Sequence, residues 1–150
     1  MGKIKSAKQA GFTLLELTGT LACTGLLVAI LLPNCLSAEE RARIANVKAN
    51  MHALQTMIET QAIQTRGAYA ADISALKAAA TRTGQWQDFG NPFTGQDGHS
   101  YADIGSQAAG VVEYEPIASG SKVMRYYIYG NDRNGAFILE DGKRIYLSNG

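Results

Sequence analysis

The sequence predicts an α+β protein in which a long, kinked N-terminal helix packs under a small antiparallel sheet of about four strands. Three observations lead to this prediction. Residues 12–32 form an apolar run with one charged side chain. Apolar residues then recur every three or four positions as far as residue 58, which is typical of an amphipathic helix. After Gly110 the pattern changes to the alternation expected of strands.

Size, charge and cysteine content limit the class of protein. A chain of 150 residues is long enough for one domain with a modest core. The formal net charge of +1 predicts no general attraction to nucleic acid or to anionic lipid. Cys23 and Cys35 would lie about 18 Å apart along one helix, which is too far for a disulfide. We therefore interpret both cysteines as small apolar helix residues.

The run 12–32 is predicted to cross a membrane and to stay on the mature protein. As a helix it would reach about 31 Å, which matches a hydrocarbon core of about 30 Å. Lys3, Lys5 and Lys8 precede it without any acid, so the positive-inside rule places the N-terminus in the cytoplasm. A secretory signal peptide would have a shorter apolar core followed by a cleavage site of small residues.

Glu16 is costly in a plain membrane anchor. A carboxylate at the centre of a membrane helix costs about 2.5–3.5 kcal/mol, and such groups usually have a partner. Glu16 lies roughly 6 Å inside the predicted span, so its cost is smaller, but no basic residue follows it within the run. A cut between Gly11 and Phe12 would create an α-ammonium group on Phe12 that could neutralise Glu16 of the same or a neighbouring chain.

The lysine-bearing leader, Gly11 and the sequence FTLLEL at 12–17 together resemble the class III signal of type IV prepilins and type II secretion pseudopilins. The resemblance implies cleavage after Gly11 by a prepilin peptidase and N-methylation of Phe12. It also implies a helical filament whose core contains the apolar helices. In that family the residue that matches Glu16 pairs with the N-terminal amine of an adjacent subunit.

The same resemblance implies partners and a location. Before assembly the chain would be a single-pass protein of the inner membrane, surrounded by lipid. An assembly platform and its ATPase would then polymerise it into a filament at the cell surface or in the periplasm. The tract 83–110 and the closing residues also resemble the loop and the sheet of pseudopilins, and the head lacks the cysteines of many major pilins.

Four segments are expected along the chain. They are a removed leader at 1–11, a membrane and filament-core helix at 12–32, an amphipathic continuation at 33–66, and a head at 67–150. Pro33 cannot donate a helical hydrogen bond, so we predict a kink or break there, at a position where the family often has a proline. The sequence SAEE at 37–40 has the pattern of a capping box that would restart the helix.

The amphipathic stripe is expected to pack under the sheet, and it consists of Ile44, Val47, Met51, Leu54 and Ile58. Arg66-Gly67 is the predicted stop of this helix. Asp72 is expected to cap a short helix that continues through about Ala80. Residues 83–110 are predicted to be a loop.

Strands are predicted at 111–115, 123–129, 136–140 and 143–147. Pro116 and the sequence SGS at 119–121 are expected to turn the chain between the first two strands. Asp141-Gly142 is a strong signal for a two-residue hairpin between the last two. We expect all four strands to form one antiparallel sheet on the second half of the long helix.

No catalytic pattern emerges, and we predict that the protein is not an enzyme. His52 and His99 lie far apart without the spacing of a zinc site, and no nucleophile elbow or phosphate-binding loop is present. Glu113 and Glu115 fall on one face of a strand, where we interpret them as solvated.

The tract NDRNG at 131–135 offers a weak calcium candidate through Asp132 and Asn134. It lacks most of the acidic ligands of an EF-hand loop, so a hairpin turn that needs no metal is the preferred interpretation. We expect no cofactor.

Nucleic-acid binding would require clustered basic and aromatic side chains. Candidates at one edge of the sheet are Arg125, Arg133, Lys143, Arg144, Tyr126, Tyr127, Tyr129 and Tyr146. Acidic residues interrupt them, so we do not expect DNA capture. A monomeric membrane-tethered binding module, or a minor pilin that captures a ligand or DNA, remains the alternative to a structural filament subunit. Proteolytic cleavage distinguishes the tethered module from the filament subunit.

Overall fold

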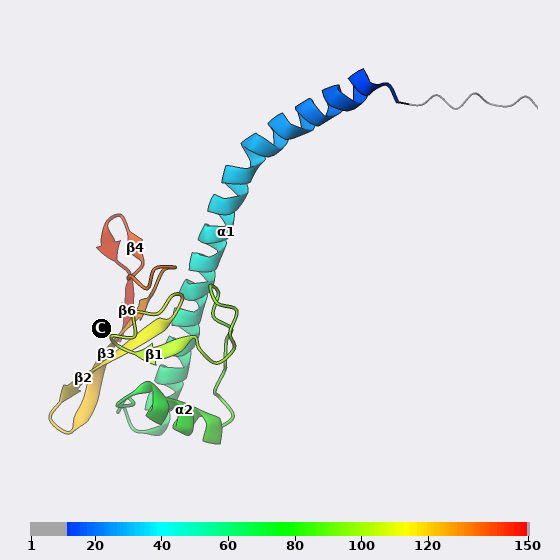
Figure 1. Cartoon of the computed structure of the whole chain (residues 1–150). Helices are drawn as coiled ribbons and strands as arrows, with labels where there is room; N and C mark the ends of the chain where they lie inside the picture. The colour runs from blue at the N-terminus through cyan, green and yellow to red at the C-terminus, as the bar shows by residue number, and fades with distance from the viewer. Residues whose placement is uncertain (1–11, 150) are drawn as a thin grey trace, which may run out of the picture. The chain divides into compact units, whose positions relative to one another are not determined.

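The computed structural model describes residues 12–149, except for the side chains of Pro33 and Asn34. The leader, with its lysines and Gly11, lies outside the described residues. The chain divides into two compact units whose boundary falls between Glu39 and Glu40, within the long helix α1 (Leu14–Gln64). The second unit places α1 against a small mixed sheet, so the predicted α+β class is confirmed (Figure 1).

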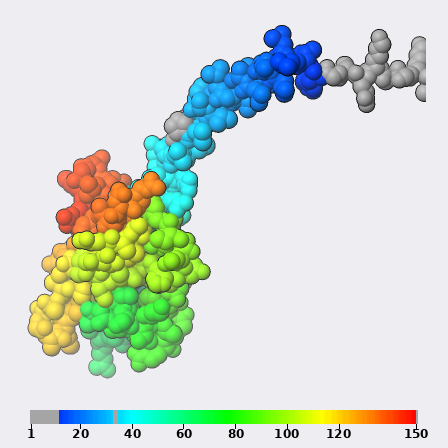
Figure 2. Space-filling model, viewed as in Figure 1, coloured from blue at the N-terminus to red at the C-terminus, as the bar shows by residue number. Residues whose placement is uncertain are grey.

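The first unit exposes its apolar side chains along the helix. Phe12 is 85% exposed and Leu26 is 68% exposed, and the apolar side chains between them are likewise uncovered (Figure 2). By length and composition, α1 could cross a membrane. An apolar surface of this extent is unusual for a soluble monomer and marks a region that contacts lipid or protein.

α1 continues through Pro33 without interruption as far as Gln64. The predicted restart of the helix at 37–40 is therefore wrong, because residues on both sides of the proline remain helical and the SAEE pattern lies inside α1. A proline removes one helical hydrogen bond, and a helix that is favourable on both sides can continue past it with a bend. The bend at Pro33 stays a prediction.

The second half of α1 forms the core of the head. Val47, Leu54 and Ile58 are fully buried and Met51 is 1% exposed, which confirms the amphipathic stripe as core packing. The predicted stop is also confirmed: the amide of Gly67 donates to the carbonyl of Ala62 at 2.8 Å. Gly67 has a φ of 86°, a left-handed conformation that glycine adopts at little cost.

The short helix α2 (Ile73–Arg82) begins where the sequence predicts. Asp72 is its N-cap residue, and its Oδ1 atom accepts hydrogen bonds from the Ala75 amide at 2.7 Å and from the Ser74 hydroxyl at 2.6 Å. Ile73 and Leu76 anchor the helix to the core. The backbone amide of Ile73 is satisfied by Asp103 at 2.9 Å, which ties α2 to the sheet.

The main sheet has four strands in the order β1-β2-β3-β6. Their bounds are β1 (Tyr101–Asp103), β2 (Val112–Ser119), β3 (Lys122–Gly130) and β6 (Tyr146–Ser148). β2 and β6 each pair antiparallel with β3, but β1 pairs parallel with β2. The sheet is therefore mixed, and the prediction of a purely antiparallel sheet is wrong because a strand forms inside the predicted loop 83–110.

The turns between the later strands differ in part from the prediction. Pro116 lies within β2 opposite Tyr126 and does not turn the chain, which reverses at Gly120. The Asp141-Gly142 hairpin is confirmed, with φ of 51° and 75° at the two residues. Its strands, β4 (Leu139–Glu140) and β5 (Lys143–Arg144), form a separate two-stranded sheet, so the main sheet ends instead with the three residues of β6.

The two faces of the main sheet have different surroundings. Tyr114, Tyr126 and Ile128 are fully buried in the core that contains the stripe of α1. Alternate residues of β2 and β3 lie on the opposite face, and there Glu115 is paired with Tyr127 in the register. The core side therefore stabilises the head, and the outward side is where β2 and β3 present their other side chains.

The Asp72 cap predicts a pH dependence of head stability. The hydrogen bonds from Ser74 and Ala75 lower the pKa of Asp72. The ionised cap therefore contributes fully to the free energy of unfolding above the ordinary aspartate pKa, and this contribution is lost as the pH falls through the lowered pKa. We expect Asp72→Ala to lower the unfolding free energy at neutral pH by about 1 kcal/mol. Denaturant unfolding between pH 7 and pH 2 measures the effect.

Asp72→Asn is the matched control, because asparagine caps helices about as well as aspartate but does not titrate in this range. It should keep near-normal stability at pH 7 and lose the acid dependence that belongs to this site. Equal stability of wild type and Asp72→Ala at pH 7 would contradict the role of the cap.

Candidate functional site

The start of α1 holds Glu16 in a capping box. Thr13 is the residue before the first helical residue, and its amide donates to Glu16 Oε2 at 2.9 Å. In the reverse direction, the Glu16 amide donates to Thr13 Oγ1 at 3.2 Å. The Thr13 hydroxyl also donates to Glu16 Oε2, at 2.8 Å. These reciprocal bonds satisfy two of the amides that a helix start leaves without partners.

This local role of Glu16 was missed by the sequence interpretation, which gave the carboxylate only an amine partner. The signal was present, because a threonine followed three positions later by glutamate, directly before an apolar run, is the capping-box pattern. The carboxylate bonds to the amide of the residue that follows Phe12. It is therefore held at the end of the helix where the proposed new terminus would form. Cleavage after Gly11, methylation of Phe12 and pairing with an amine stay predictions.

The hydroxyl groups of the apolar helix are satisfied within it. Thr18 and Thr20 donate to the carbonyls of Leu15 and Leu17, at 3.0 and 2.9 Å. Thr24 donates to the carbonyl of Thr20 at 2.7 Å. A hydroxyl with an internal partner avoids most of the cost of leaving water. These threonines are therefore compatible with lipid or with a tightly packed bundle.

Cys23 and Cys35 are both exposed and free. They occupy the helix as the sequence predicts, and their thiols face outward with the apolar side chains around them.

Glu113 is fully buried, which overturns its interpretation as a solvated carboxylate. Its oxygens accept hydrogen bonds from the amides of Gly105 at 2.8 Å and Gln107 at 2.7 Å. The side-chain amide of Asn131 donates to it at 2.7 Å. A carboxylate with three donors can be buried at acceptable cost. Sequence could not reveal these donors, because two are backbone groups of a loop.

The network around Glu113 explains the parallel strand. Residues 104–111 return the chain from the end of β1 to the start of β2, and Glu113 binds the amides in the middle of that return. Asn131 also donates to the carbonyl of Ala108 at 3.3 Å. A single buried side chain of β2 therefore holds the loop that allows β1 to pair parallel with β2.

The weak calcium candidates lie in a turn in which Asp132 accepts hydrogen bonds from the backbone of the turn itself. Asp132 Oδ1 accepts hydrogen bonds from the amides of Asn134 at 2.7 Å and Ala136 at 3.0 Å. The backbone around Asn131 bridges to Phe137, in line with the preferred interpretation as a hairpin turn. Within residues 12–149, no group of three or more metal-ligating acids, histidines or cysteines is present.

The predicted basic and aromatic edge is divided by the fold. Tyr126 is fully buried on the core side, where its hydroxyl donates to Glu59 at 2.5 Å. Arg133 forms an ion pair with Glu40 at 3.3 Å. Tyr127, Tyr129, Tyr146 and Arg144 remain together on the outward side of the sheet. The eight residues therefore do not form one nucleic-acid surface, because strand alternation sends neighbours to opposite faces.

Comparison of the chain with protein-family models, with curated proteins and with solved structures finds no match. The structure itself defines an α+β protein with one N-terminal helix that is long and apolar enough to cross a membrane. Any assignment beyond this class rests on the residues and on their geometry.

The Glu113 network predicts a specific loss of stability. Glu113→Gln places an NH₂ group against two amide donors and Asn131, so at least one donor loses its partner. We expect the unfolding free energy of the head to fall by about 1–3 kcal/mol. Thermal or denaturant unfolding of the full chain in detergent measures the change.

Glu115→Gln is the matched control on the same strand. Glu115 is half-buried and receives a hydrogen bond from the Tyr129 hydroxyl at 3.1 Å. Its amide variant keeps an acceptor, so the expected loss is below about 1 kcal/mol. If both variants were equally stable, Glu113 would not have the organising role given to it.

Proposed function

We propose that the protein is a structural subunit of a type IV pilus or of a type II secretion pseudopilus. The observation that carries the proposal is the sequence GFTLLEL at 11–17, followed by a helical run to residue 32 whose apolar side chains are exposed. The resemblance of this sequence to the prepilin signal supplies the family. The uncovered helix supplies a surface that a monomer in water could not keep.

Under the proposed function, the apolar half of α1 contacts lipid first and other subunits later. Before assembly it crosses the inner membrane with its N-terminus in the cytoplasm and is surrounded by lipid. After assembly the same side chains pack against those of other subunits in the filament core. The internal hydrogen bonds of Thr18, Thr20 and Thr24 support this proposal, because they leave no hydroxyl without a partner in either place.

Glu16 gives the proposed assembly its specificity. Prepilin peptidase would cut after Gly11 and leave a free amine on Phe12, which a methyltransferase would then modify. The capping box supports the proposal because it holds the Glu16 carboxylate at this end of the helix before any partner arrives. A cationic terminus of an adjacent subunit would then neutralise the carboxylate in an apolar interior, where an unpaired charge is expensive.

The work proposed for the protein is mechanical and requires neither catalysis nor a cofactor. Its partners are copies of itself, the prepilin peptidase, and the platform and ATPase that drive assembly. The alternative, a monomeric membrane-tethered binding module, uses the same helix and head. Mass spectrometry of the surface fraction separates the two, because a tether would begin at Met1 and a filament subunit at methylated Phe12.

Glu16 variants test the assembly mechanism. Glu16→Ala should insert in the membrane and be cleaved, yet yield at most about a tenth of the wild-type filament, because one charged pair of about 1.5–3 kcal/mol is lost at every contact. Electron microscopy and immunoblotting of sheared filaments measure the yield. Carbonate extraction and the mass of the N-terminal peptide verify insertion and cleavage.

Glu16→Gln separates the charge pair from the helix cap. Glutamine can still accept the Thr13 hydrogen bonds, as in capping boxes that use it, but it cannot neutralise an amine. We expect it to fail in assembly as Glu16→Ala does. Normal filament yield from Glu16→Gln would show that capping alone is required, and normal yield from both variants would refute the pairing.

A further inference from the structure

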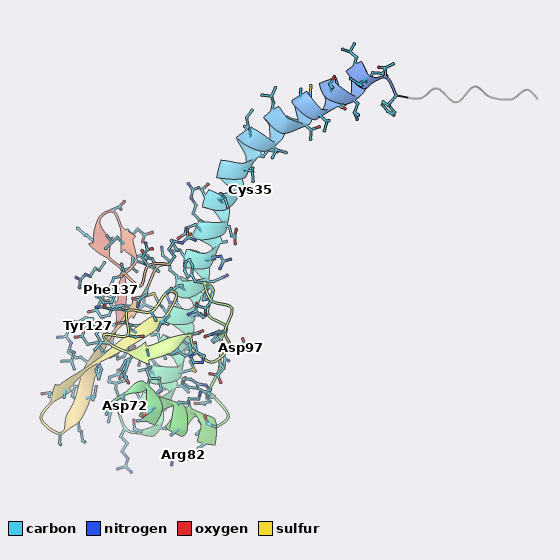
Figure 3. The ribbon with its side chains drawn as sticks, in the orientation of Figure 1. Cys35, Asp72, Arg82, Asp97, Tyr127 and Phe137 are labelled. Carbon is cyan, nitrogen blue, oxygen red and sulfur yellow. The ribbon has the colours of Figure 1, made fainter. Side chains whose placement is uncertain are left out.

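The outward side of the sheet carries a connected group of aromatic rings. Tyr127 and Tyr146 have ring centres 5.5 Å apart, and Tyr129 lies 5.0 Å from Phe137. Tyr129 and Tyr146 are directly paired across β3 and β6, which joins the two contacts into one group. Figure 3 labels Tyr127 and Phe137, whose rings each contact the ring of Tyr129. Tyr146 is 55% exposed, so the group is open to ligands.

Arg144 is the cation of this aromatic group. Its guanidinium carbon lies 4.9 Å from the centre of the Phe137 ring, a cation–π contact that restricts its position. In residues 12–149, no carboxylate lies within 4.0 Å of its nitrogens. Nearby bases differ in this respect, since Lys48 pairs with Glu140 and Arg133 with Glu40. Arg144 therefore offers a planar, oriented cation that an anion can approach.

Three hollows in the surface meet at Arg144. Their volumes are about 510, 350 and 310 Å³, and Arg144 lines each of them. Phe137 lines the largest and the smallest, and Tyr146 lines the third. Three separate spaces that share one cation and open to solvent suit a chain of several small rings better than one compact molecule.

Hydrogen-bond acceptors complete the smallest hollow. Glu115 and Gln107 line it together with Tyr129. Burial and the hydrogen bond to Glu115 raise the pKa of Tyr129 to about 12, so its hydroxyl stays protonated and donates to that carboxylate. Ionised Glu115 only accepts hydrogen bonds. A ligand that fits here must therefore bring hydroxyl or amide donors as well as a negative charge.

We propose that this surface binds an acidic carbohydrate, a chain of sugar rings of which one carries a carboxylate. The guanidinium of Arg144 would bind a uronate carboxylate through two parallel hydrogen bonds. The apolar faces of the sugar rings would stack on Tyr146 and the neighbouring aromatic rings, and the sugar hydroxyls would donate to Glu115. The site belongs to the head alone and does not depend on filament assembly.

Charge and chemistry favour this ligand over a nucleic acid. A nucleic-acid strand carries one negative charge on every nucleotide, whereas a carbohydrate chain with a single uronate carries only one. Glu115, Glu140 and Asp141 line the same hollows and would repel such a strand. A uronate needs one cation at its carboxylate and acceptors around its hydroxyls, which is the arrangement around Arg144.

Calorimetric titration of the full chain in a neutral detergent with glucuronosyl-xylobiose, a trimer with one carboxylate, tests the proposal. Xylotriose serves as the neutral ligand of the same length. Wild type should bind the acidic trimer and bind the neutral one at least about tenfold more weakly, as expected for a charged hydrogen-bonded pair. Arg144→Gln should weaken the acidic trimer by about tenfold or more, and Arg144→Lys should give an intermediate loss because it keeps the charge without the planar fork.

Lys122→Gln is the matched control, because it removes one positive charge from an exposed residue of β3 that lines none of these hollows. It should change the affinity by less than about twofold, the size of a screened surface charge. Unfolding curves of the variants, which should match that of wild type, verify that each head is folded.

Three results would overturn the proposal. They are no binding of glucuronosyl-xylobiose by wild type, an equal loss in Lys122→Gln and Arg144→Gln, and equal affinity for the acidic and the neutral trimer. Displacement of the trimer by an equal concentration of single-stranded oligothymidylate would instead assign the surface to nucleic acid. None of these results bears on filament assembly, which the Glu16 variants test separately.

Discussion

The structure depends on one helix that meets two different surroundings along its length. The second half of α1 buries its stripe under the sheet, where Val47, Leu54 and Ile58 lose all contact with water. The first half has the same kind of apolar side chain but leaves it uncovered. Burial of apolar surface is the main favourable term in folding. Covering the apolar surface of the first half would therefore be strongly favourable, and lipid or other protein chains can provide that cover. The head folds on the second half of this helix, and the exposed first half determines what else the protein contacts.

Within the head, one buried carboxylate connects three separate segments. Glu113 of β2 accepts hydrogen bonds from the amides of Gly105 and Gln107 in the return loop and from the side chain of Asn131 in the turn after β3. Gln107 is also a lining residue of the hollows beside Arg144. The position of that lining residue is therefore tied to a side chain that never reaches the surface. A buried carboxylate is costly unless it accepts several hydrogen bonds, and here those bonds give a loop without regular structure a single defined path.

Features set by local rules could be read from the sequence, and features set by distant contacts could not. The stripe of α1, the stop at Gly67, the cap at Asp72 and the Asp141-Gly142 hairpin depend on neighbours within a few positions. The parallel strand β1 depends on a side chain ten or more positions away, and three residues give too short a pattern to recognise. Pro116 misled the interpretation because proline is tolerated within strands where its missing amide hydrogen is not required. For the candidate site, residue types were visible, but the division of neighbouring tyrosines between two faces required the pairing register.

The capping box changes how Glu16 should be understood. A carboxylate that had no local partner would have to remain near water until assembly, and its cost would oppose burial of the first turn. Thr13 removes part of this cost by donating two hydrogen bonds, and it does so in any surroundings because both groups belong to the same turn. Neutral donors leave the negative charge in place, however, and a charge in an apolar interior still requires a counter-charge. Under the proposed function, the turn would therefore lower the cost of carrying the acid into the membrane, while an amine would still have a reason to bind there. The Thr13 hydrogen bonds would then be sufficient at the membrane interface but insufficient inside a bundle, and one carboxylate could serve both the free subunit and the proposed polymer.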